Sequence, residues 1–340
     1  MRIVTGSNYT HVAGDSPILF PEYGKNREEL SNFVGLLRGD ETVVTSSLEL
    51  IDMIASRFRG GDDLLTYSGT GRSLTLNEVY DLRRKLEFDP RGGFTGEDAP
   101  TSVLFVEGKT DAKFFKAVYK KLFGFKECRR APLNLKPIEN VFKRDNFDLM
   151  RREDGYYLAV IPSEGNSGAV TNLRNFLKAL NVFDLRVDGV GIAVDIDEGG
   201  DRAMDMIRNG LTELSPKETP SGYVVDDVNV VPLLIGLPFR HDLIEWEKPT
   251  IEDLMLHLME LEGLFDRMLP AIKALERPLK PKEAMYVGLA VYGYWGNLEG
   301  FYELFVMRSR FRNLKRVLRR SEVMEGIKNL VPSPSKVRGT

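Results

Sequence analysis

Hydrophobic and polar positions follow two different patterns along this chain. Between residues 102 and 209, short apolar runs alternate with segments in which apolar residues recur at helical spacing. The apolar runs 103–106, 159–162 and 191–194 have the length of buried strands, and each precedes a helical segment. This alternation predicts an α/β fold whose core is a parallel sheet with helices on both faces. After Thr250 the pattern becomes mainly helical.

The distribution of turn-forming residues divides the chain of 340 residues into parts. A stretch rich in glycine, proline and charge predicts a linker at residues 91–100. We therefore expect a small α/β domain at 1–90 and a larger domain at 101–307. Residues 308–340 are expected to form a basic helix followed by a disordered tail. The turn-rich segment 216–222 is expected to be a loop inside the larger domain.

Two of the apolar runs end in carboxylates. Glu107 directly follows the run 103–106, and Asp195 and Asp197 follow the run 191–194. The carboxyl ends of parallel strands are where ligands bind in open α/β sheets. Residues i and i+2 of a strand point to the same side, so both aspartates can reach one cation. Carboxylate oxygens are ligands that Mg²⁺ prefers, and the pattern therefore predicts a magnesium site.

The residues after Glu107 predict a sharp turn into a helix. Gly108 lacks a Cβ where the chain leaves the strand, and Thr110 or Asp111 can cap the helix that follows. Taken singly, each carboxylate could also serve only to solvate a loop end or to cap a helix. The joint occurrence of both motifs on apolar strands favours the metal site.

A third strand end carries a polar loop. The run 159–162 breaks into Ser163-Glu-Gly165-Asn-Ser before a helical segment. The backbone N–H groups of such a loop can bind phosphate at a helix start. An ordinary strand-to-helix turn explains the same residues equally well.

The order of these motifs resembles a known family. A strand followed by Glu107-Gly108-x-x-Asp111, and a second strand ending in Asp195-x-Asp197, resembles the Toprim domain of topoisomerases, primases and several nucleases. The similarity covers roughly residues 102–307. It is closer to the Toprim half of the overcoming-lysogenization-defect nucleases and to archaeal stand-alone Toprim proteins. The resemblance implies a Rossmann-like sheet that binds Mg²⁺ or Mn²⁺ through Glu107, Asp195 and Asp197.

The resemblance also implies a second metal position after a further strand at 230–235. In the family, an acidic helix start often completes that position, and Glu252 is the matching candidate here. A competing explanation is structural, because Thr250 and Asp253 have the spacing of a capping box and acidic residues in a first helical turn complement the helix dipole.

A lysine near the reacting phosphate is a further implication of the resemblance. The segment 280–295 is similar to the C-terminal part of the family, and Lys282 or Lys280 could stabilise charge on phosphate oxygens. We take Lys282 as the catalytic candidate. The expected phosphate contacts are Gly108, Lys109, Ser163, Gly165 and Lys280.

The N-terminal part is similar to the last strands and helices of an ABC-type ATPase. A strand at 41–45 runs into an amphipathic helix, and a second strand is expected at 63–67. Ser46 stands where that family has its γ-phosphate-sensing histidine, and the sequence has no phosphate-binding loop of the Gly-x-x-x-x-Gly-Lys type. The part is thus either an ATPase remnant that cannot hydrolyse ATP alone or an unrelated accessory domain.

Composition narrows the class of protein. The apolar fraction of 42% and charged fraction of 29% are typical of a soluble globular protein. The absence of a long apolar run or a signal-peptide core predicts a cytoplasmic protein without a membrane partner. Cys128 is the single cysteine, which excludes a disulfide framework and a multi-cysteine zinc site. The three histidines form no metal-spaced cluster, and His257 is expected to pack within a helix.

Charge is distributed unevenly. The formal net charge is −3, but the chain beyond residue 308 is rich in lysine and arginine. Such a basic helix can bind phosphates, although many charge runs are only solvated faces. Phe311, Leu314 and Leu318 recur at helical spacing, so one side is expected to pack on the core.

Two functional hypotheses follow. In the first, the chain is a Mg²⁺- or Mn²⁺-dependent nuclease: Asp195 and Asp197 hold the metal, and Glu107 is a ligand or a general acid/base. Asp111 supports the site, and Glu252 binds a second ion. In the second, the chain is a non-catalytic Toprim module that works with a separate ATPase. Expected partners are nucleic acid, DNA rather than RNA, and a second copy of the chain.

Overall fold

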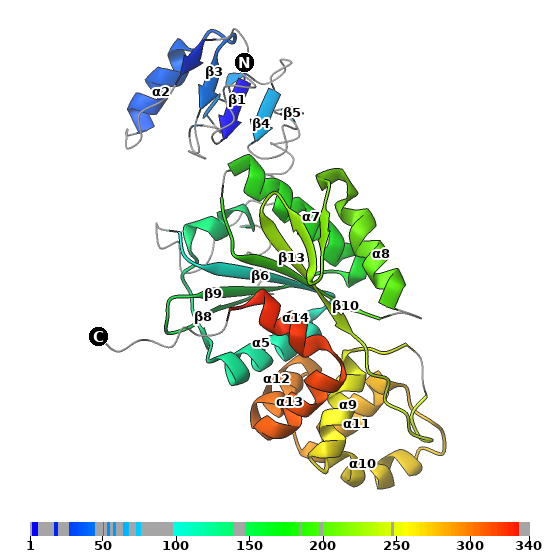
Figure 1. The fold of residues 1–340 in the computed structure, drawn as a ribbon. Helices are drawn as coiled ribbons and strands as arrows, with labels where there is room; N and C mark the ends of the chain where they lie inside the picture. Colours follow the sequence, from blue (N-terminus) through cyan, green and yellow to red (C-terminus); the bar gives the residue numbers. More distant parts are fainter. Residues whose placement is uncertain are drawn as a thin grey trace, which may run out of the picture.

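The larger of two sheets forms the centre of the protein (Figure 1). The computed structural model describes residues 2–5, 17–19, 27–44, 50, 53–54, 57–58, 64–67, 73–75, 98–138, 147–183, 185–196, 200–245 and 248–332. Within them the larger sheet has the strand order β11-β12-β13-β10-β6-β9-β8-β7. Its strands are β6 (Thr101–Val106), β7 (Lys126–Glu127), β8 (Asp148–Arg151), β9 (Tyr157–Pro162), β10 (Gly189–Asp195), β11 (Lys217–Thr219), β12 (Gly222–Val225) and β13 (Val228–Ile235).

The predicted α/β fold is confirmed, with one addition at each edge of the sheet. The four central strands β13, β10, β6 and β9 are parallel, as expected. The outer strands pair antiparallel on both sides. The expectation of a loop at 216–222 is wrong, because β11 and β12 form a hairpin there. The hairpin pairs Thr219 with Gly222, so only the two residues between them form its turn.

Helices cover both faces of this sheet, which explains why its central strands are apolar throughout. On one face lie α7 (Gly165–Phe183) and α8 (Gly200–Leu211), packed on Val103, Phe105 and Ile192. On the other face lie α5 (Lys109–Phe123), α12 (Leu298–Arg308) and α14 (Val323–Leu330), packed on Leu104 and Ala193. Two short 3₁₀ helices, Leu133–Ile138 and Thr212–Leu214, complete the connections.

The chain after β13 is helical, as expected. It contains α9 (Ile251–Leu261), α10 (Leu264–Lys273), α11 (Pro281–Tyr292), α12, α13 (Phe311–Arg320) and α14. The last helix lies very close to the sheet at Gly326, where an added Cβ would stand 3.0 Å from the Pro232 carbonyl oxygen. Helices α13 and α14 therefore belong to the same hydrophobic core as the sheet.

The expected orientation of the basic helix is confirmed only in part. Leu314 and Leu318 of α13 are buried, together with Val317. Phe311 is 47% exposed, contrary to expectation, because it stands in the first turn at the margin of the buried stripe. Residues 333–340, the expected disordered tail, lie outside the described residues.

A second sheet is formed by the N-terminal part. Its strands are β1 (Arg2–Thr5), β2 (Ile18–Leu19), β3 (Thr42–Val44), β4 (Leu64–Tyr67) and β5 (Ser73–Thr75), in the order β2-β3-β1-β4-β5, and α2 spans Arg27–Leu36. The strands predicted at 41–45 and 63–67 are confirmed as β3 and β4. Ser46 and residues 91–97 of the expected linker are not among the described residues. No described helix is both long and apolar enough to span a bilayer.

Candidate functional site

The ends of two neighbouring strands bring the first carboxylates together. β6 and β10 are parallel neighbours, and Val106 pairs with Ala193. Glu107 therefore leaves the sheet one residue after this pair, and Asp195 two residues after it. Both emerge at the carboxyl edge, where parallel α/β sheets bind ligands. The expected juxtaposition of Glu107 and Asp195 follows directly from this register.

The start of α5 adds a third carboxylate. Gly108 is the N-cap, and its extended backbone donates an N–H to Asp111 Oδ2 at 2.8 Å. Asp111 thus folds back over the first helical turn and is only 6% exposed. Of the two cap residues expected from the sequence, it is Asp111 that closes the turn, from the third helical position.

Glu107 has one oxygen without a partner. Its Oε2 is buried and makes no hydrogen bond to any described residue. A buried carboxylate oxygen without a hydrogen bond or counter-charge is unfavourable, so such atoms are usually paired or bound to a cation. This orphaned oxygen fits a hard cation such as Mg²⁺.

The start of α9 separates two adjacent acidic residues by role. Asp253 is 2% exposed and accepts hydrogen bonds from the Phe239 N–H (2.8 Å), the Thr250 N–H (2.9 Å) and the Thr250 hydroxyl (3.1 Å). These bonds use both carboxylate oxygens, so the capping-box interpretation is confirmed for Asp253. Glu252 is half-buried, and its charge contributes to the raised pKa values of Asp111 and Asp195.

Four carboxylates interact electrostatically at this edge of the sheet. Burial first, and then the charges of Glu252 and Glu107, raise the pKa of Asp111 to about 8. Burial and the charges of Asp111, Glu107 and Glu252 raise the pKa of Asp195 to about 9. After burial, the charge of Asp111 contributes most to the raised pKa of Asp195. We call Glu107, Asp111, Asp195 and Glu252 the carboxylate cluster.

Two lysines act electrostatically on the carboxylate cluster, and the other two candidate lysines lie at helix starts. The charge of Lys282 lowers the pKa of Asp111, which places this exposed side chain near the cluster. Lys280 lies at the N-cap of α11 next to Glu283, and its N–H donates to Glu283 Oε2 at 3.0 Å. Lys109 is exposed at the first position of α5. Lys248, which the sequence did not single out, also lowers the pKa of Asp195.

The polar loop after β9 lies beside Glu107, and two of its backbone N–H groups are already hydrogen-bonded. The Ser163 N–H donates to the Val106 carbonyl at 2.8 Å, and the Gly165 N–H donates to the Glu107 carbonyl at 3.1 Å. The Ser163 hydroxyl accepts a hydrogen bond from the Asn172 side chain at 3.0 Å. These bonds favour the interpretation of the loop as a strand-to-helix turn that holds Glu107 in place.

Comparison with known proteins places most of the chain in a family. The family model described as "Protein of unknown function (DUF3226)" matches residues 101–322. The chain belongs to the DUF3226 family. All four members of the carboxylate cluster lie within the matched DUF3226 region.

Two archaeal proteins are similar to this DUF3226 protein. The uncharacterized protein MJECL12 of Methanocaldococcus jannaschii is 25% identical over 220 residues, which are 60% of this chain and 88% of the relative. The crystal structure of hypothetical protein PH0156 from Pyrococcus horikoshii superposes with a TM-score of 0.58 at 25% identity, over 68% of this chain and 99% of that one.

One buried residue near the carboxylate cluster was not predicted from the sequence motifs. The Tyr302 hydroxyl, on α12, is buried without hydrogen-bond geometry to any described atom. It nevertheless lies near enough to Glu252 and Asp111 that burial and these two charges raise the pKa of Tyr302 well above its ordinary value. Sequence spacing gave no signal for it, because α12 reaches the cluster only through helix packing.

The predicted metal ligand Asp197 lies outside the described residues. Among the residues whose positions are described, no group of three acidic, histidine or cysteine side chains is arranged closely enough to bind one metal ion. His257, as expected, is a packed helix residue: it is 8% exposed, and its Nε2 lies 3.2 Å from the Pro238 carbonyl oxygen.

Asp253→Ala should destabilise the DUF3226 protein. The substitution leaves the buried Phe239 N–H without an acceptor and removes the cap of α9, which together cost about 2 kcal/mol. Urea unfolding followed by circular dichroism measures this loss. Glu252→Ala is the matched control, since it removes the adjacent carboxylate without removing a cap. Equal stability of Asp253→Ala and the native protein would contradict the capping role.

Asp195→Asn should raise the melting temperature in EDTA. With a raised pKa, the folded chain binds more protons than the unfolded chain between pH 3.8 and about 9, so stability falls as pH rises through this range. At about pH 8 the substitution removes the cost of keeping Asp195 protonated in the folded protein, and each kcal/mol of that cost should raise the melting temperature by about 2–4 °C. Differential scanning calorimetry at several pH values measures the effect. A lower melting temperature for Asp195→Asn, with a flat pH profile for the native protein, would contradict the like-charge cluster.

Proposed function

We propose that this protein is a metal-dependent nuclease, which binds Mg²⁺ or Mn²⁺ at the carboxylate cluster and hydrolyses phosphodiester bonds of nucleic acid. The observation that carries the proposal is the buried, unpaired Oε2 of Glu107 beside Asp111 and Asp195, two carboxylates whose pKa values are raised by burial and by the charges of their neighbours. A divalent cation is often the largest local charge in such a site and would offset this repulsion.

The Toprim resemblance implies which residues bind each metal ion. Glu107 and Asp195 would hold the cation together with Asp197, and Glu252 would contribute to a second ion. A bound cation polarises phosphoryl oxygens and lowers the pKa of bound water. Asp111 supports this set from the first turn of α5, where Gly108 fixes one of its oxygens.

The chain's own residues would manage charge and protons around the phosphate. Glu107 can act as general acid/base at the attacking or leaving oxygen. The raised pKa of Asp111 lets this side chain retain a proton near neutral pH. Lys282, exposed beside Asp111, can stabilise negative charge on the phosphate oxygens.

A cleavage assay tests the proposal. Native protein is incubated with supercoiled plasmid, single-stranded DNA and RNA, with Mg²⁺ or Mn²⁺, beside an Asp195→Ala/Asp197→Ala variant. We expect metal-dependent cleavage by the native protein and at least an about hundredfold lower cleavage rate for the variant. Mutating a residue that only hydrogen-bonds to a metal ligand already lowers activity by about 10- to 100-fold.

An Asp205→Ala/Asp266→Ala variant is the matched control, because it removes two exposed carboxylates away from the cluster. It should cleave like the native protein, and circular dichroism should show all three proteins folded. Absence of cleavage on every substrate by folded native protein would contradict the nuclease proposal. It would leave the non-catalytic module that works with a separate ATPase.

A further inference from the structure

We infer that the exposed face of α13 is a binding surface for the nucleic-acid backbone. For its ligand class the inference rests on the proposed function, but the surface is separate from the carboxylate cluster. We call it the α13 basic face. Its members are the cationic residues of this helix: Arg312, Lys315, Arg316, Arg319 and Arg320.

The α13 basic face lies on a helix that is firmly anchored. Leu314, Val317 and Leu318 are buried in the core shared with the sheet. The helix contains no acidic residue. Its four arginines are exposed, so the cationic groups lie on the side opposite the anchor. The fold therefore presents these charges to solvent on a rigid support.

Most of these charges have no partner in the described fold; Lys315 is the exception, since its Nζ lies 4.3 Å from the centroid of the Phe311 ring. Within the described part of the chain, no guanidinium group of α13 makes an ion pair or a hydrogen bond. In contrast, Arg310, just before the helix, is paired with Glu262 at 3.2 Å. Arg312, Arg316 and Arg320 follow one another at i+4, a spacing at which like charges repel and destabilise a helix. Arg319 and Arg320 lie in the last turn, where cations complement the helix dipole, but helix stability does not explain Arg312 and Arg316, and an external anion does.

The arrangement matches a repeating polyanion. Residues four apart are separated by about 6 Å along a helix axis, so the arginines form a regular row. Guanidinium groups bind phosphate with two parallel hydrogen bonds. A membrane surface is a poor match, because a helix that lies on a bilayer inserts its apolar face, and that face of α13 is buried in the protein.

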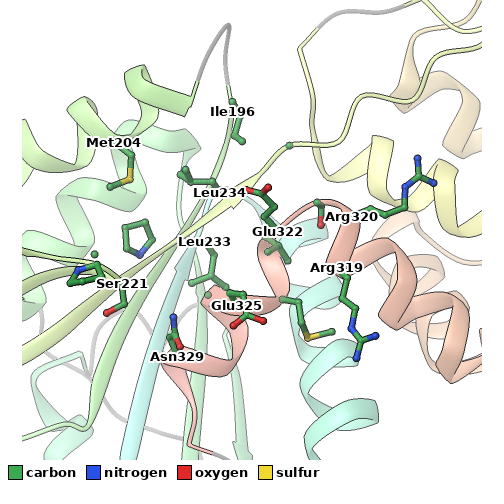
Figure 2. Close-up of a pocket in the computed structure, with 18 of the residues that line it drawn as sticks. Ile196, Met204, Ser221, Leu233, Leu234, Arg319, Arg320, Glu322, Glu325 and Asn329 are labelled. Carbon is green, nitrogen blue, oxygen red and sulfur yellow. The ribbon is translucent and has the colours of Figure 1, made fainter.

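A cleft extends from the C-terminal end of the α13 basic face towards the end of β10. Arg319 and Arg320 line a cavity of about 810 Å³ that is also lined by Ile196, the residue directly after Asp195. Figure 2 shows both arginines at one side of the cavity, with their guanidinium groups pointing away from Leu233 and Leu234. A nucleic-acid strand bound on α13 can thus reach the end of strand β10.

Two glutamates also line this cleft. Glu325 is paired with Lys328 at 2.7 Å, which offsets its charge. Glu322 remains on the α14 side of the lining (Figure 2) and would repel phosphate there. The charges of the cleft therefore direct a nucleic-acid backbone towards the arginines.

The test measures binding to a fluorescently labelled DNA oligonucleotide, single-stranded and duplex, in EDTA over a range of salt concentrations. Arg312→Gln/Arg316→Gln/Arg319→Gln should weaken binding at least about tenfold at low salt. It should also reduce the slope of log K against log salt by about 2–3, since each lost phosphate contact removes about 0.9 on duplex DNA.

The matched control is Arg129→Gln/Arg130→Gln/Lys273→Gln, which removes three exposed cations from other surfaces. It should keep the native affinity and the native slope. A triple arginine variant with native affinity and slope would overturn the inference while leaving the metal site untouched. Competition by polyglutamate as effective as that by DNA, or no DNA binding by native protein at low salt, would overturn nucleic acid as the ligand of this surface.

Discussion

The parallel pairing of β6 with β10 is the constraint on which the site depends. It fixes the ends of two buried strands side by side and forces Glu107 and Asp195 to leave the sheet together. Both strands lie between two layers of helices, so little water reaches the carboxylates. Burial first, and then the like charges of the neighbouring carboxylates, raise the pKa values of Asp111 and Asp195.

The helices hold the carboxylates together against this repulsion. The N-cap of α5 fixes Asp111, and the capping box of α9 fixes the turn from which Glu252 reaches the cluster. Local hydrogen bonds of ordinary kinds thus maintain an arrangement that its own charges oppose. Such arrangements of perturbed acids are concentrated at functional sites, and here they coincide with an unpaired buried oxygen on Glu107.

The sequence predicted those features of the site that depend on the local pattern of apolar and polar residues. Strand ends at Glu107 and Asp195 and the cap at Asp253 could be read from apolar runs and spacing, because backbone geometry alone determines them. The β11–β12 hairpin was missed because its strands are short and partly exposed. Tyr302 could not be found, since it reaches the cluster only through packing of α12. The exposure of Phe311 likewise depends on how far the core extends over the start of α13.

The most direct test of the metal site is a crystal structure of the protein grown with Mn²⁺, with anomalous diffraction recorded to locate the ion. The account predicts an anomalous peak within about 2.2 Å of carboxylate oxygens of Glu107 and Asp195, at the carboxyl edge between β6 and β10. An ordered carboxylate cluster without a peak, in crystals that contain Mn²⁺, would contradict it.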